Sequence, residues 1–192
     1  MSYFPAFINL SQQKILIVGG GNVAYEKLER LLDFTDAIDV IAKELSTQMQ
    51  ASLIERNLSY EKRAYKEGDI QGYDIVIIAV DNIPLQAAIY KEARNYRCLC
   101  NAVDSIEYCD FIFPAYVKEG DLTVAISTSG ASPAFAKHFK RYLKTVIPNS
   151  IASFLKDMRQ LRKTMPKGKE RMQFLDKKAK DYMNNWSNNE QC

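Results

Sequence analysis

The stretch KILIVGGGNVAYEKLERLL, residues 14–32, passes from an apolar run through three glycines into a helical pattern. Four consecutive aliphatic residues before the glycines predict a strand that is buried on both faces, over residues 14–19. Ala24, Leu28 and Leu31 then recur at the spacing of one helix face. We therefore expect a strand, a tight glycine turn and a helix, and this unit decides the fold.

The glycines satisfy the dinucleotide-binding fingerprint G-x-G-x-x-A, with Gly19, Gly21 and Ala24 at its fixed positions. The first glycine permits the tight turn, the second lets a pyrophosphate approach the backbone, and the alanine keeps helix and strand close. The phosphates would then lie on the free N–H groups at the helix start. A purely structural turn is the alternative, but the regular pattern that follows favours cofactor binding.

That pattern alternates apolar strands with amphipathic helices as far as about residue 112. Such repetition predicts a parallel sheet with right-handed crossovers and helices on both faces, which is an α/β fold of the Rossmann type. The further expected strands cover residues 37–43, 58–65, 73–81 and 97–104, and the helices between them cover residues 46–57 and 84–96.

The pattern changes after residue 110. Apolar and polar side chains then alternate on both sides of a turn at residues 119–121, which predicts an antiparallel hairpin. Three helices follow, and we expect the last ten residues to be frayed. The helices are expected from Pro133, from Ser150 and over residues 169–182. The predicted domains are a Rossmann domain (1–112), a β-hairpin and helix dimerisation region (113–147) and a small helical domain (148–192).

The part after residue 112 has too few residues to build its own core. The helix that begins at Pro133 carries an apolar stripe that includes Phe135, Phe139 and Tyr142. A second copy of the chain is the simplest partner for such a stripe, so we expect a homodimer.

Composition and charge narrow the function classes. The chain has 192 residues, 47% of them apolar, and no run approaches the roughly 18 apolar residues that span a bilayer. The amino terminus also lacks a signal-peptide pattern, so we expect a cytoplasmic protein. The net charge of +3 is too small to indicate nucleic acid, but basic residues concentrate in residues 137–144 and 156–180. We therefore expect an anionic partner or substrate, and neither a nucleic acid nor a membrane.

The four cysteines favour buried thiols over a metal site. Cys98 and Cys100 share one face of an expected strand, and their C-x-C spacing differs from the usual C-x₂-C of zinc sites. Cys109 and Cys192 are isolated, and His138 is the only histidine. Free cysteine is among the most buried residue types, so we assign no metal site.

Two segments are candidates for chemistry. Asp104 ends a predicted strand at the carboxyl edge of the sheet, where a carboxylate can act as a general base, although a turn cap explains it equally well. The segment STSGASP, residues 127–133, leads hydroxyl side chains into a helix start, with Lys137 and Arg141 one and two turns further on. It suits anionic groups, but a capped loop with a solvated basic face is the favoured interpretation.

The residue that would hold the adenosine ribose stays open. Asp39 lies about 20 positions after the glycine turn but inside the second strand, whereas Lys43 and Glu44 follow the end of that strand. Glu44 suits a ribose hydroxyl and Lys43 suits a 2′-phosphate, so these residues leave NAD and NADP both open.

Five segments together resemble the sirohaem synthase dehydrogenase family: FPAFINL, ILIVGGGNVAYEK, NAVD, DFIFPA and LTVAISTSGASPAFAK. Members are precorrin-2 dehydrogenases, and some are also sirohydrochlorin ferrochelatases. The resemblance implies that NAD⁺ accepts a hydride as precorrin-2 becomes sirohydrochlorin, on the route to sirohaem or cobalamin, in a homodimer. It also implies Fe²⁺ or Co²⁺ as a co-substrate if the protein inserts metal.

The resemblance places the catalytic aspartate on Asp104, in NAVD. The assigned cofactor contacts are Gly19, Gly20, Gly21, Asn22, Val23, Ala24, Lys43, Glu44 and Val80. The substrate carries many carboxylates, and its candidate contacts are Asn101, Ser127, Thr128, Ser129, Lys137 and Arg141. A non-catalytic NAD(H)-binding redox sensor with a basic partner-binding half is the competing interpretation.

Overall fold

A computed structural model describes residues 3–188, which divide into two compact units between Ile112 and Phe113. The further division expected at residue 147 remains a prediction, and one hydrophobic cluster of the second unit includes Val117 and Ile151 from either side of it.

The first unit is built on a five-stranded sheet in which every neighbouring pair is parallel. The strand order β3-β2-β1-β4-β5 places β1 at the centre, and β1 pairs with β2 on one side and β4 on the other. This order confirms the expected Rossmann-type fold. The strands are β1 (Ile15–Val18), β2 (Ile38–Ala42), β3 (Ser59–Lys62), β4 (Ile75–Ile78) and β5 (Leu99–Ala102).

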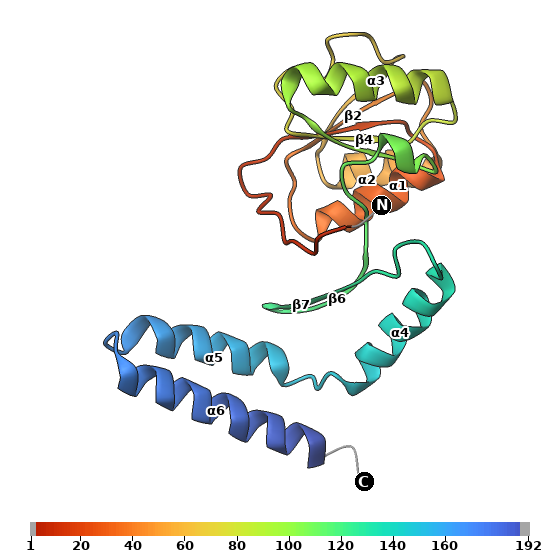
Figure 1. Cartoon of the computed structure of the whole chain (residues 1–192). Coiled ribbons are helices and arrows are strands. Elements are labelled where there is room, and N and C mark those ends of the chain that lie inside the picture. The colour runs from red at the N-terminus through yellow and green to blue at the C-terminus, as the bar shows by residue number, and fades with distance from the viewer. Residues whose placement is uncertain (1–2, 189–192) are drawn as a thin grey trace. The chain divides into compact units, whose positions relative to one another are not determined.

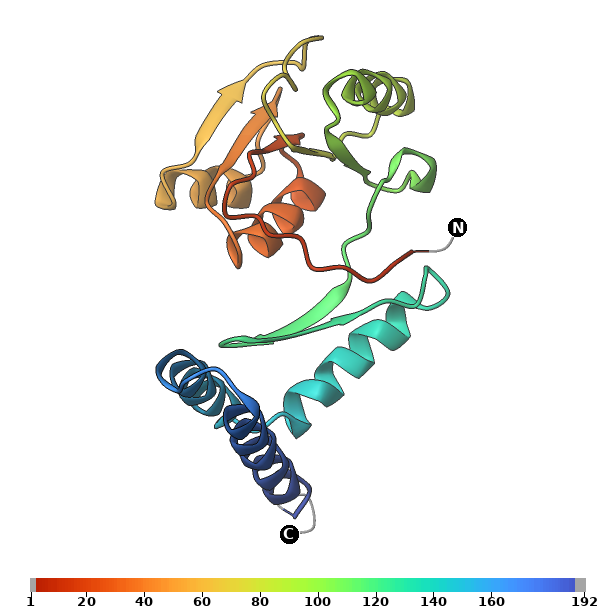
Figure 2. The same cartoon turned by 60° about the vertical axis from the view of Figure 1, so that its left-hand side comes forward.

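Helices cover both faces of this sheet, as Figures 1 and 2 show. Helices α1 (Asn22–Leu32) and α2 (Thr47–Glu55) lie on one face, and α3 (Ile83–Tyr96) lies on the other. The aliphatic residues of the central strands β1 and β4 are 0–3% exposed, because both faces of these strands are covered. The edge strand β3 is exposed along its whole length, which explains its polar sequence.

Side-chain caps explain where two of these helices begin. The Ser46 hydroxyl accepts a hydrogen bond from the N–H of Met49 at 3.2 Å and starts α2. The Asn82 side chain accepts from the N–H of Leu85 at 3.0 Å and starts α3, with a proline in the first turn. A short 3₁₀ helix, η1 (Ile106–Tyr108), follows β5.

The second unit contains the expected hairpin and three helices. Val117, Ile147 and Ile151 form its small buried cluster. The rings of Phe154 and Tyr182 stack with centroids 4.0 Å apart and join its last two helices. The elements are β6 (Ala115–Glu119), β7 (Leu122–Ile126), α4 (Pro133–Val146), α5 (Ile151–Thr164) and α6 (Lys169–Asn188).

The expectation of a frayed end from residue 183 is wrong as far as Asn188. Helix α6 continues to that residue because Trp186 packs edge-on against Tyr182, with ring centroids 6.4 Å apart. The last four residues of that prediction lie outside the described residues. Between residues 3 and 188, no helix is long and apolar enough to cross a membrane.

Candidate active site

A pocket of about 500 Å³ lies at the carboxyl ends of four strands of the first unit. It sits where the chain order reverses on either side of β1, the position at which open parallel sheets bind ligands. The turns after β1, β2, β3 and β4 each contribute to its wall. The lining residues are Val18, Gly19, Gly20, Ile41, Ala42, Lys43, Glu44, Arg63, Ala64, Tyr65, Ala79, Val80, Asp81, Asn82 and Leu85.

The three glycines of the turn differ in how much space a side chain would have at their positions. A Cβ on Gly19 would lie 2.2 Å from the carbonyl oxygen of Ala79, and the φ of +126° at Gly19 also excludes most side chains. A Cβ on Gly20 would lie 2.2 Å from the carbonyl oxygen of Glu44. Around a Cβ on Gly21, by contrast, no described atom lies within 4 Å. The first two glycines let the turns pack together, and the third keeps space open beside the pocket.

That open space adjoins the start of α1. The first helical hydrogen bond runs from the N–H of Tyr25 to the carbonyl of Gly21 at 3.0 Å, so the N–H groups of residues 22–24 have no acceptor within the helix. The N-cap is a glycine, which has no side chain to occupy those donors, and the first turn carries no acidic residue. These features fit a dinucleotide whose pyrophosphate lies on the helix start.

The predicted cofactor contacts gather in this region. Gly19, Gly20, Lys43, Glu44 and Val80 line the pocket. The other four belong to the turn and the start of α1: Gly21, Asn22 and Val23 are exposed and Ala24 is buried.

The structure also separates the candidates for the ribose. Asp39 accepts a hydrogen bond from the Tyr73 hydroxyl at 2.9 Å and does not line the pocket. Glu44 and Lys43 are exposed at the pocket wall. Of these acidic residues, Glu44 is therefore the one placed to accept from a ribose hydroxyl.

Asp104 lies two residues beyond the end of β5, exposed and with a φ of +60°. Lys27 lies within electrostatic range of its carboxylate. Burial is the main cause that lowers the pKa of Lys27, and the carboxylates of Glu26 and Asp104 oppose that shift. An exposed carboxylate at the edge of the sheet can accept or hold a proton.

Gln86 supports this edge of the sheet, and the sequence analysis missed it. Its side-chain N–H₂ group donates to the carbonyls of Val80 at 2.8 Å and Val103 at 3.3 Å, so it joins the turn after β4 to the residue before Asp104. Gln86 is only 3% exposed, and its side-chain oxygen has no partner among the described residues. The sequence signal for Gln86 was its position: it is a polar residue on the apolar face of α3, three positions before the buried Ile89.

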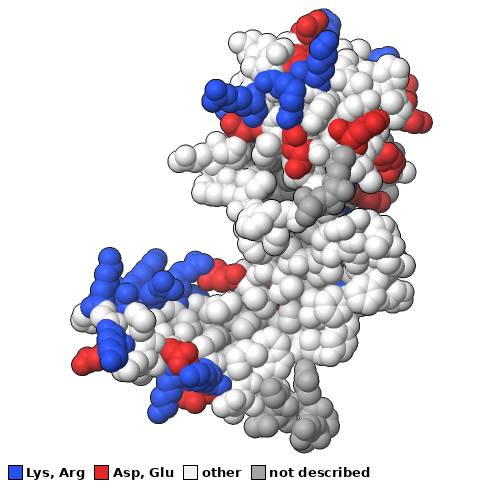
Figure 3. All heavy atoms as spheres, viewed as in Figure 1, with Lys and Arg blue, Asp and Glu red and all other residues white. Residues whose placement is uncertain are grey.

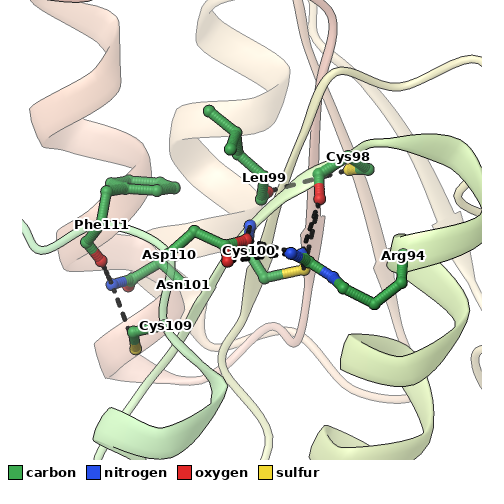
Figure 4. A network of polar contacts seen from close by, with 8 residues as sticks. All are labelled: Arg94, Cys98, Leu99, Cys100, Asn101, Cys109, Asp110 and Phe111. Carbon is green, nitrogen blue, oxygen red and sulfur yellow. Dashed lines mark hydrogen bonds and ion pairs between the residues drawn. The ribbon is translucent and has the colours of Figure 1, made fainter.

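Asn101 has a structural contact in the protein. It is 5% exposed and donates to the carbonyl of Phe111 at 2.8 Å, as Figure 4 shows. Asp110 accepts from the N–H of Cys100 at 2.8 Å and pairs with Arg94 at 2.6 Å. These bonds hold the segment after η1 alongside β5. A substrate contact at Asn101 remains a prediction.

The expectation of buried thiols is confirmed for Cys98 and Cys100, which are free and at most 1% exposed. Burial raises the pKa of Cys98 to about 12 and that of Cys100 to about 11. Cys109 is half-buried, and Cys192 lies outside the described residues. The described part of the chain contains no cluster of three or more His, Cys, Asp or Glu residues that could hold a metal ion.

The remaining substrate candidates belong to the second unit. The Ser127 hydroxyl accepts from the N–H of Ser129 at 3.1 Å, and the Thr128 hydroxyl accepts from the N–H of Ser132 at 3.2 Å. These bonds shape the loop that leads into α4, with Ser129 at a φ of +50°. Each of the two hydroxyls keeps its own hydrogen for donation to a ligand.

Cations are frequent on the helices of this unit. Lys137 and Arg141 are exposed on α4, and Arg141 lies 2.9 Å from the ring nitrogen Nδ1 of His138. Figure 3 shows further Lys and Arg side chains gathered over α5 and α6. The basic character expected for this half is therefore present on its surface.

Comparisons with known proteins give a family match in each of the two units. Residues 6–115 match a family described as putative NAD(P)-binding, and residues 119–145 match a family described as sirohaem biosynthesis protein central. The siroheme synthase of Methylococcus capsulatus is 35% identical over 182 residues, and that of Baumannia cicadellinicola is 34% identical over 148 residues. These alignments cover 92% and 77% of this chain but only 38% and 32% of the respective relatives.

A solved structure described as SirC, precorrin-2 dehydrogenase, has the same fold. It superposes with a TM-score of 0.75 at 24% identity, over 91% of this chain and 88% of that one. The match to the NAD(P)-binding family confirms the expected nicotinamide dinucleotide cofactor, and the structural match agrees with the Rossmann-type fold.

Proposed function

This chain belongs to the sirohaem synthase dehydrogenase family, and from that membership we propose that it oxidises precorrin-2 to sirohydrochlorin with NAD⁺. The observation that carries the proposal is the glycine-walled pocket beside an uncapped helix start, with Asp104 at the same edge of the sheet. Precorrin-2 and sirohydrochlorin are thus the proposed substrate and product.

Different residues of the chain are assigned to cofactor binding and to proton transfer in this reaction. The backbone of the glycine turn and the first turn of α1 would hold the pyrophosphate, and Glu44 would accept a hydrogen bond from the ribose. When bound, NAD⁺ supplies the hydride acceptor. The substrate loses a hydride and a proton in the oxidation, and Asp104 takes the proton as general base.

We assign binding of the substrate's carboxylate groups to the second unit. Ser127, Thr128 and Ser129 offer hydroxyl or backbone donors, and Lys137 and Arg141 offer positive charge. Hydrogen bonds in which a partner is ionised are about twice as strong as neutral ones, so a polycarboxylate suits this set.

Asp104→Asn tests the catalytic assignment. Asparagine tolerates the left-handed backbone found at this position, so the fold should persist while the general base is lost. We expect the rate of NADH formation from precorrin-2 to fall by about 10²-fold or more, with NADH affinity little changed. Glu107→Gln removes an exposed carboxylate from the same segment and serves as the control.

An Asp104→Asn variant with the rate of the unmodified protein would refute the role of Asp104. NADH binding with no turnover of precorrin-2 by the unmodified protein would refute the dehydrogenase and favour the redox sensor.

Metal insertion is a further part of the proposal. Asp104 would accept the pyrrole protons that leave sirohydrochlorin as Fe²⁺ or Co²⁺ enters. Anaerobic addition of either ion to sirohydrochlorin, with and without the protein, measures this activity. A rate equal to the uncatalysed reaction would restrict the protein to dehydrogenation. The route served, sirohaem or cobalamin, would follow from which ion is inserted.

We also propose that the protein acts as a homodimer. Three aromatic side chains of α4 form an exposed row. The ring centroids of Phe135 and Phe139 are 5.7 Å apart, and those of Phe139 and Tyr142 are 6.2 Å apart. Phe135 and Tyr142 are more than half exposed. Aromatic rows of this kind are typical of interfaces.

A further inference from the structure

We propose that Asp69 is the specificity-determining residue of the dinucleotide pocket: by holding Arg63, it makes the pocket select NAD over NADP. The inference rests on the proposed function, because it concerns the same cofactor site. The two cofactors differ only by a 2′-phosphate on the adenosine ribose, and the cations near that ribose decide between them.

Arg63 is placed to meet such a phosphate. It follows the end of β3, and it lines the pocket together with Lys43 and Glu44 from the end of the neighbouring strand β2. Glu44 is the residue assigned to the ribose. Two cations beside that residue would by themselves favour a 2′-phosphate, because arginine binds phosphate through two parallel hydrogen bonds.

The guanidinium of Arg63, however, is already occupied. Its Nη1 and Nη2 bind the two carboxylate oxygens of Asp69 at 2.6 and 3.0 Å. Its Nε binds Glu61 at 2.7 Å, and Nη1 also donates to the carbonyl of Ala64 at 3.0 Å. Four of the five N–H donors of an arginine are thus used within the protein.

The local charge is therefore unfavourable to a phosphate. Three cations, Lys43, Arg63 and Lys66, lie among four carboxylates, those of Glu44, Glu61, Asp69 and Asp81. Burial opposes ionisation of Asp69, but the hydrogen bonds from Arg63 and from the N–H of Lys66, together with the positive charges of both residues, lower the pKa of the carboxyl, so it is ionised at neutral pH. A doubly charged phosphate would enter a cluster with one excess negative charge and no free pair of guanidinium donors.

The surrounding loop keeps Arg63 in this position. Asp69 also accepts from the N–H of Lys66 at 2.7 Å. The carboxylate of Glu92, on α3, accepts from the N–H of Gly68 at 2.6 Å and from the Tyr65 hydroxyl at 2.7 Å. The loop after β3 is thus attached to α3 at two points, and turning Arg63 toward a ligand would break several hydrogen bonds.

The test compares NADH and NADPH binding, by fluorescence titration, for the unmodified protein and for Asp69→Asn. We expect the unmodified protein to prefer NADH. In Asp69→Asn, one negative charge is lost and the Arg63 donors are freed, so the ratio of the two affinities should move toward NADPH by about tenfold or more. Glu67→Gln is the matched control, because Glu67 is an exposed carboxylate of the same loop and makes none of the described contacts to Arg63.

A double variant assigns the effect to Arg63. Asp69→Asn combined with Arg63→Gln should lose the gained NADPH affinity. If Asp69→Asn does not fold by circular dichroism, Glu61→Gln frees the Nε donor and should give a smaller change in the same direction.

An unchanged ratio in Asp69→Asn, or in Glu61→Gln where Asp69→Asn does not fold, would overturn the inference. A similar change in Glu67→Gln, or preference of the unmodified protein for NADPH, would also overturn it. Failure of the unmodified protein to bind either dinucleotide would instead overturn the proposed function, and the inference with it.

Discussion

Four described residues other than glycine have a left-handed backbone: Asn57, Arg97, Asp104 and Ser129. Asn57 lies two residues after the end of α2 and Arg97 directly follows α3, and this conformation commonly terminates a helix at such positions. Asp104 and Ser129 end no helix, and they are the predicted catalytic residue and a predicted substrate contact. Such backbone strain concentrates at functional sites, which adds independent support to both assignments.

The glycines of the turn give a first prediction at the residue scale. Gly20→Ala should destabilise the fold by about 3 kcal/mol or more, because the new Cβ would meet the carbonyl oxygen of Glu44, which is backbone and cannot move aside. Gly21→Ala should change stability by less than about 1 kcal/mol, because its Cβ enters open space. It should still weaken NADH binding, because that space adjoins the helix start.

Urea unfolding and NADH titration of both variants check this contrast. Equal stability of the two variants would contradict the packing role of Gly20. Unchanged NADH affinity in Gly21→Ala would contradict the proposed path of the pyrophosphate.

The sequence could predict the site residues whose role depends on local spacing. The fingerprint glycines, Lys43 and Glu44 follow directly from the positions of strand ends. Arg63 and Gln86 could not be predicted in the same way, because Arg63 acquires its role from contacts across the pocket and Gln86 from bonds to two separate turns. Side-chain contacts between distant segments require the folded structure.

At the scale of elements, the sequence pattern predicted every strand of the sheet but overestimated the length of all five. The strand expected over residues 97–104 is β5, Leu99–Ala102, because the bonds of the sheet stop where the chain turns toward Asp104. The strand expected over residues 58–65 is β3, which is polar and exposed along its whole length. The hydrogen bonds of Asn101 and Asp110 beside β5 had no periodic signal, since the segment that they hold is not a strand.

The thiols of Cys98, directly before β5, and Cys100, within it, predict how stability depends on pH. Burial raises their pKa values from 9.0 to about 12 and about 11. The folded protein therefore keeps protons that the unfolded chain releases, so the stabilisation is complete below pH 9 and is lost as pH rises from 9 toward 12. Burial and the hydrogen bond to Asp39 likewise raise the pKa of Tyr73, to about 12 from 10.0, which adds loss above pH 10.

Urea unfolding between pH 7.5 and 11 measures this dependence. The free energy of unfolding should fall across the alkaline range. It should fall less steeply in a Cys98→Ala, Cys100→Ala double variant, whatever that variant's stability at neutral pH. An identical slope in the two proteins would contradict the assignment to the thiols.

At the scale of the whole molecule, the two units carry different parts of the proposed function. Every residue that lines the pocket lies between Val18 and Leu85, within the first unit. The second unit supplies hydroxyls and cations, and the match to the sirohaem biosynthesis family at residues 119–145 covers its hairpin turn and most of α4. The same helix carries both the candidate substrate contacts Lys137 and Arg141 and the aromatic row.

That helix carries the last prediction, which concerns assembly. Light scattering should show a dimer at micromolar concentration, because the row formed by Phe135, Phe139 and Tyr142 costs free energy while it faces water. Aromatic anchors at interfaces often contribute about 2 kcal/mol or more each, so Phe135→Ser with Tyr142→Ser should weaken dimerisation by about 10²-fold or more. Tyr96→Ser, at an exposed aromatic residue of α3, is the control and should leave the dimer intact. A monomeric unmodified protein would refute the homodimer, and a dimer that persists in the double variant would place the interface away from α4.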